Sequence, residues 1–82
     1  MECLTITVKS PEGLHVKPAS EMFMAANQFS SQITAILGEK RADCKNILDI
    51  LGLRALFGDR LQLEFEGRDE KEAKKAFQSL FE

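Results

Sequence analysis

The sequence predicts an α+β fold of the open-faced sandwich type, with three helices on one face of a four-stranded antiparallel sheet. Three observations lead to this prediction. Several short segments alternate apolar and polar residues, as strands with one buried face do. Other segments place apolar residues at helical spacing. Glycine and proline separate the two kinds of segment. The predicted order is βαββαβα within one small domain, residues 1–82.

The first half of the chain predicts a strand, a helix and a hairpin. Residues 4–9 alternate regularly, and the turn residues at 10–13 end this strand. The apolar spacing then becomes helical from Val16 to about residue 28. Alternation returns at 33–37, and a glycine turn leads into a short return strand at 40–43.

The second half predicts a helix, a strand and a final helix. Asn46 is a favourable N-cap for a helix that begins at Ile47. Residues 61–66 alternate cleanly as a strand with one face toward water. Asp69 and Glu72 have the spacing of a capping box, which predicts the start of a last helix.

The apolar residues from Ile47 to Phe57 would cover most of the circumference of one helix. Packing on a sheet needs only a one-sided stripe. We therefore expect some of these side chains to be exposed as an apolar docking patch, with a more deeply buried helix or a dimer contact as the alternatives.

The composition excludes several classes of protein. Hydrophobic residues make up 44% and charged residues 29% of the chain, which is typical of a globular domain. The net charge of -2 and the absence of Trp and Tyr argue against nucleic-acid binding. No apolar run would span a bilayer and no signal peptide is recognisable, so we expect no membrane insertion and a cytoplasmic location. Cys3 and Cys44 lack zinc-site spacing, so we expect two reduced thiols and no metal.

His15 is the only histidine and the main candidate for chemistry. It follows Gly13 and stands where the predicted helix begins. The backbone N–H groups of Val16 and Lys17 are unpaired there and, with the helix dipole, favour an anion. The Lys17 ammonium adds a positive charge, and Pro18 stiffens the first turn without losing a needed donor. An imidazole at this place can carry a phosphoryl group covalently.

The segment Gly-Leu-His-Val-Lys-Pro-Ala at residues 13–19 resembles the active-site motif Gly-Leu-His-Ala-Arg-Pro-Ala of the HPr family. These are phosphocarriers of the bacterial phosphoenolpyruvate-dependent sugar phosphotransferase system. Residues 27–29, 45–48 and 67–73 also resemble family segments, at the end of the first helix and at the starts of the second and third.

The resemblance implies that His15 takes a phosphoryl group on Nδ1 from phosphorylated Enzyme I and passes it to sugar-specific EIIA-type domains. It implies a monomeric covalent intermediate, not an enzyme with its own turnover, and no cofactor or metal. Apolar and basic residues on the two helices are expected to bind these partners, and possible further partners are regulatory proteins. The expected contacts are Ser20, Met24, Ile47, Leu48 and Leu51, with Lys45 and Arg54 steering acidic surfaces.

Three positions depart from the family pattern. Lys17 replaces the active-site arginine and loses its two-donor fork. Asn46 replaces a regulatory serine and cannot be phosphorylated. Residues 54–57 lack a glycine that family members often have near the helix end, so the helix either continues or turns differently before Gly58. These departures keep a second hypothesis open, namely an HPr-like regulatory interaction module, of nitrogen type or in signalling, with weak or partner-specific phosphotransfer.

Overall fold

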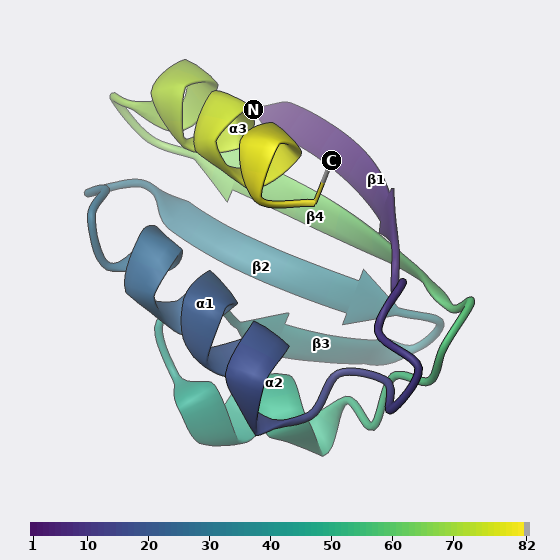
Figure 1. Cartoon of the computed structure of the whole chain (residues 1–82). Helices are drawn as coiled ribbons and strands as arrows, with labels where there is room; N and C mark the ends of the chain where they lie inside the picture. Colours follow the sequence, from purple (N-terminus) through teal and green to yellow (C-terminus); the bar gives the residue numbers. More distant parts are fainter. Residues whose placement is uncertain (82) are drawn as a thin grey trace.

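The computed structural model describes residues 1–81, and its sheet carries all helices on one face, as predicted (Figure 1). The strands pair antiparallel in the order β1-β4-β2-β3. The elements are β1 (Glu2–Thr7), α1 (Val16–Ala26), β2 (Gln32–Leu37), β3 (Lys40–Asp43), α2 (Ile47–Gly52), β4 (Arg60–Glu66) and α3 (Glu70–Leu80).

The core lies between the sheet and the helices. Alternation along β4 buries Leu61, Leu63 and Phe65, and the residues between them are exposed or half-buried. Phe65 meets Phe77 of α3 edge to face, with ring centroids 5.5 Å apart. This geometry is favourable for aromatic pairs. The period-2 pattern thus gives the sheet one buried and one open face.

Hydrogen bonds join the segment after β1 to the loop before β4. The Val8 N–H donates to the Asp59 carbonyl at 2.8 Å, and the Gly58 N–H donates to the Val8 carbonyl at 2.8 Å. The paired ends of β1 and β4 bring these two segments to the same edge of the fold (Figure 1). The segment that contains His15 is therefore attached to the segment that follows α2.

Helix α1 begins at Val16, as predicted, but it ends at Ala26 and not at residue 28. The Asn27 side chain donates to the Phe23 carbonyl at 2.8 Å, which satisfies a carbonyl in the last turn. This local bond and the turn that follows end the helix two residues early.

Helix α2 is capped by Asn46, as predicted. Its Oδ1 accepts from the N–H groups of Leu48 at 3.0 Å and Asp49 at 3.3 Å. The prediction of one helix reaching Phe57 is wrong, because α2 ends at Gly52. Arg54 has a φ of 53°, which takes the chain out of the helix. Leu53 and Ala55 are buried within the following loop.

Replacing Asn46 by alanine is expected to cost about 1 kcal/mol of stability, since two N–H groups lose their acceptor. Urea denaturation followed by circular dichroism measures this cost. Asn46→Asp is the matched control, because it keeps the acceptor and should cost much less. Equal losses in the two variants would contradict the capping role.

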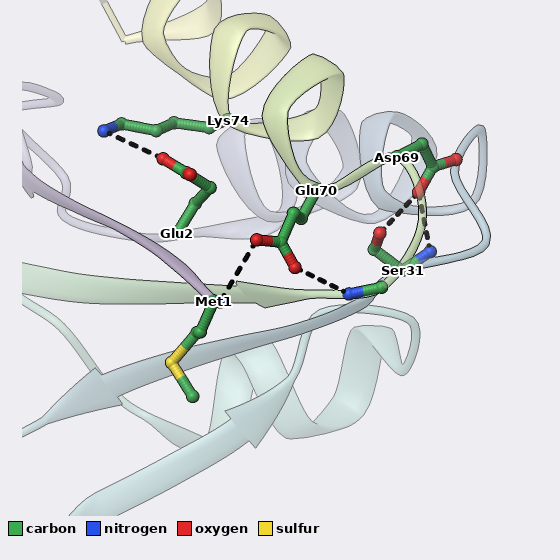
Figure 2. A network of polar contacts seen from close by, with 7 residues as sticks. Met1, Glu2, Ser31, Asp69, Glu70 and Lys74 are labelled. Atoms are coloured by element: carbon green, nitrogen blue, oxygen red, sulfur yellow. Dashed lines mark hydrogen bonds and ion pairs between the residues drawn. The ribbon is translucent and has the colours of Figure 1, made fainter.

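The predicted capping box at Asp69 and Glu72 is wrong. The Asp69 side chain does not cap α3. Its carboxylate accepts from the Ser30 N–H at 2.9 Å. It also accepts from the Ser31 N–H at 2.9 Å and from the Ser31 hydroxyl (Figure 2). At the start of α3 it is the Glu70 carboxylate that accepts from a nearby backbone group, the Gly67 N–H, at 3.1 Å. Asp69 therefore joins the start of α3 to the segment before β2.

Within residues 1–81, no helix has the length and apolarity to cross a membrane. Cys44 is buried, and burial, together with the nearby Asp43 charge, raises the pKa of its thiol to about 12. Cys3 is exposed on the open face of the sheet. Neither thiol is part of a disulfide within residues 1–81.

Candidate functional site

His15 occupies the N-cap position of α1, with an extended backbone. The N–H groups of Val16 and Lys17 lie in the first turn and so lack an intrahelical acceptor, and the His15 side chain does not cap them. The Ala19 N–H already donates to the His15 carbonyl at 3.0 Å. The imidazole, 38% exposed, thus stands beside two available donors at the positive end of the helix.

Backbone contacts fix the segment before His15. The Gly13 N–H donates to the Ser10 carbonyl, and the Leu14 N–H donates to the Ala55 carbonyl, each at 2.9 Å. Gly13 has a φ of +77°, and a Cβ added there would lie 2.6 Å from the Ala55 oxygen. Only glycine allows this close approach without displacement. The loop after α2 therefore supports the histidine segment directly.

One nitrogen of the imidazole has polar neighbours. Nε2 lies 3.2 Å from Ser10 Oγ and 3.7 Å from Glu12 Oε1. Ser10 Oγ accepts the Nε2 hydrogen in one tautomer, which leaves Nδ1 with its lone pair. The sequence analysis did not identify Ser10 or Glu12; the only signal was that polar residues stand three and five positions before the histidine.

The other residues of the motif take the places predicted for them. Val16 and Lys17 are the first two residues of α1 and both are exposed. Pro18 lies in the first turn, where its missing N–H leaves no hydrogen bond unmade. Lys17 has no ion pair within residues 1–81. Its ammonium is thus available to an anion bound near the start of α1.

The exposed apolar side chains gather on α1, α2 and the loop after α2. Apart from Met1, the large hydrophobic residues most exposed in the described part of the chain all belong here, at 64–74% exposure. They are Val16, Met24, Leu48, Leu56 and Phe57. The sequence analysis placed the last two on a helix, but they project from a loop.

The remaining predicted contacts are less accessible. Ser20, Ile47 and Leu51 are half-buried, and the two apolar residues also pack against the core. The Lys45 ammonium donates to the Phe29 carbonyl at 2.6 Å, just beyond the end of α1. The structure thus places Lys45 at the opposite end of α1 from His15, whereas Arg54 is exposed near the histidine segment.

No cluster of three or more His, Cys, Asp or Glu side chains within residues 1–81 could hold a metal ion. The site consists of an imidazole, backbone N–H donors and a lysine. This arrangement suits covalent attachment of an anionic group to the imidazole.

Comparison with known proteins agrees with this chemistry. The family model described as "PTS HPr component phosphorylation site" matches residues 3–82. The chain is 38% identical over 80 residues to the phosphocarrier protein HPr of Lysinibacillus sphaericus, covering 98% of this chain and 91% of that protein. It is also 38% identical over 73 residues to the phosphoryl donor subunit DhaM of the PEP-dependent dihydroxyacetone kinase of Providencia stuartii, covering 89% of this chain and 15% of that protein.

Solved structures share the fold. The crystal structure of HPr-C-His from Thermoanaerobacter tengcongensis superposes with a TM-score of 0.93 at 38% identity, covering 99% of this chain and 91% of that one. The match extends over all seven elements of the βαββαβα order. The chain belongs to the HPr family of phosphocarrier proteins of the phosphotransferase system.

Proposed function

We propose that His15 is the phosphorylated residue and that Nδ1 forms the bond to phosphorus. The observation that carries this proposal is the half-exposed imidazole at the start of α1, with Nε2 facing Ser10 and Glu12. As the bond from phosphorus to the donor side chain breaks, a bond from phosphorus to Nδ1 forms. The Nε2 hydrogen stays on the ring, so no proton acceptor is needed in this step.

The residues after His15 hold the phosphoryl oxygens in this proposal. The N–H groups of Val16 and Lys17 donate to them, and the positive end of α1 stabilises their charge. The Lys17 ammonium adds a point charge from solvent. Pro18 keeps the first turn in helical geometry, so the donors are already in place before the phosphoryl group arrives.

The donor is phosphorylated Enzyme I and the acceptors are EIIA-type domains, in the cytoplasm. Leu48 and Met24 form the exposed centre of the docking surface, with Ser20, Ile47 and Leu51 at their sides. Asn46 carries no hydroxyl group, so the phosphorylation of a serine at this position has no counterpart here. The names of the relatives favour the carrier function over a purely regulatory module.

The test is incubation of the protein with Enzyme I and labelled phosphoenolpyruvate. We expect acid-labile, base-stable label on the wild type and none on His15→Ala. Circular dichroism of the variant checks that it is folded, which we expect because His15 makes no side-chain cap bond to α1. Equal labelling of the two proteins would refute the assignment of His15.

Replacing Leu48 by aspartate is expected to weaken binding to Enzyme I by about 2 kcal/mol, as for a central interface residue. Leu48 is 74% exposed, so the folded state should tolerate the charge. Titration calorimetry measures the affinity and thermal unfolding measures the stability. Gln28→Asp is the control, because Gln28 is exposed just beyond the C-terminal end of α1. Unchanged affinity of the Leu48 variant would place the interface elsewhere.

A further inference from the structure

Arg54 adopts a backbone conformation that disfavours it. Its φ is 53°, and among residues 1–81 every other residue with a positive φ is a glycine. A side chain in this left-handed region costs conformational free energy that glycine does not incur. Nothing in the fold requires this side chain, because Arg54 is exposed. The cost is understandable if the guanidinium has a function.

The loop places Arg54 near His15. The Ala55 carbonyl accepts from the Leu14 N–H at 2.9 Å, so Arg54 directly precedes the acceptor and His15 directly follows the donor. Through this bond, the Cα atoms of Arg54 and His15 are separated by at most about 14 Å. An extended arginine on one side and a phosphorylated imidazole on the other can together cover such a distance. Gly13 holds the two segments in contact.

The Arg54 guanidinium is also available. Within residues 1–81 it has neither an ion pair nor a hydrogen bond through its side chain. The nearby Asp59 carboxylate accepts from the Leu56 N–H at 2.8 Å and so serves the turn of its own loop. The exposed Arg54 side chain therefore has no partner within residues 1–81 and can bind an anion.

We propose that Arg54 binds the phosphoryl group on His15. Its planar fork donates two hydrogen bonds to two phosphoryl oxygens, which the single ammonium of Lys17 cannot do in that geometry. The phosphoryl group would then be held from two sides, by Lys17 and the start of α1 on one and by Arg54 on the other. This inference rests on the proposed function, since it requires phosphorylated His15.

The test uses isolated phosphoprotein, so that effects on partner docking do not enter. Potassium phosphoramidate phosphorylates accessible histidines without Enzyme I and supplies the sample. Phosphorus NMR then follows the titration of the phosphoryl oxygens in the wild type and in Arg54→Gly, Arg54→Lys and Arg68→Gly. The Arg68 variant is the control, because this exposed arginine follows β4 and makes no ion pair within residues 1–81.

We expect the midpoint of phosphoryl protonation to rise by several tenths of a pH unit in Arg54→Gly, less in Arg54→Lys, and not in Arg68→Gly. Folding should not interfere, because glycine relieves the strain at position 54. If Arg54→Gly titrates like the wild type, the proposal is overturned. This holds even if the variant receives phosphoryl groups more slowly from Enzyme I, because slower transfer alone indicates that Arg54 steers the partner. Failure of Enzyme I to label the wild type would instead refute the proposed function.

Discussion

Replacing Gly13 by alanine is expected to destabilise the protein by about 3 kcal/mol and to slow phosphoryl transfer strongly. Two costs combine at this position. The φ of +77° is unfavourable for alanine, and the new Cβ would lie 2.6 Å from the Ala55 oxygen and 3.2 Å from the Leu56 Cα. The loop must move away, which breaks the bond between the Leu14 N–H and the Ala55 carbonyl. Urea denaturation and the rate of labelling by Enzyme I measure the two effects.

Gly38→Ala is the matched control for the backbone cost. Gly38 has a φ of +60°, and a Cβ added there meets nothing within 4 Å. It lies in the turn between β2 and β3, and no backbone hydrogen bond within residues 1–81 joins this turn to the histidine segment. We expect this variant to lose about 1 kcal/mol and to transfer normally. If the two variants lose stability equally, the close contact between Gly13 and Ala55 does not contribute to the free energy of unfolding.

Much of the fold could be predicted from the sequence because it depends on local patterns. Alternation from Leu61 to Glu66 fixes which face of β4 is buried, whatever the strand pairs with. Asn46 caps α2 through bonds to residues two and three positions later, which lie within the range of a sequence motif. His15 could be placed at the start of a helix because the glycine before it and the proline after it mark that boundary.

The errors have a common physical origin in contacts between distant segments. The apolar residues after Gly52 favoured a longer helix, but Leu53 and Ala55 are buried in the core from a loop. The Asp69 carboxylate binds Ser31, which lies 38 residues earlier, in place of its own helix. Periodicity and capping motifs do not encode such partners, so tertiary contacts overrode the local preference.

Asp69 is expected to make the stability depend on pH in strongly acidic solution. The hydrogen bond from the Ser31 hydroxyl (Figure 2), with that from the Ser30 N–H, lowers the pKa of this carboxyl from 3.8 to about 2. Because the pKa is lower in the folded state than in the unfolded chain, ionised Asp69 stabilises the fold above the unfolded value. This contribution decreases as the pH falls from about 4 toward about 2, where the folded protein also takes up the proton.

The substitution Asp69→Asn removes the charge while keeping the size of the side chain. We expect it to lower the urea midpoint at neutral pH and to flatten the dependence of that midpoint on pH between about 4 and 2. Glu72→Gln is the control, because Glu72 is exposed in the first turn of α3, whereas Asp69 accepts the hydrogen bonds from Ser30 and Ser31. A pH dependence of Asp69→Asn as steep as that of the wild type would show that other carboxyl groups govern acid unfolding. A flattened profile would establish that ionised Asp69 links α3 to the segment before β2. Protonation of Asp69 would then weaken the hydrogen bonds that hold this segment where β2 begins.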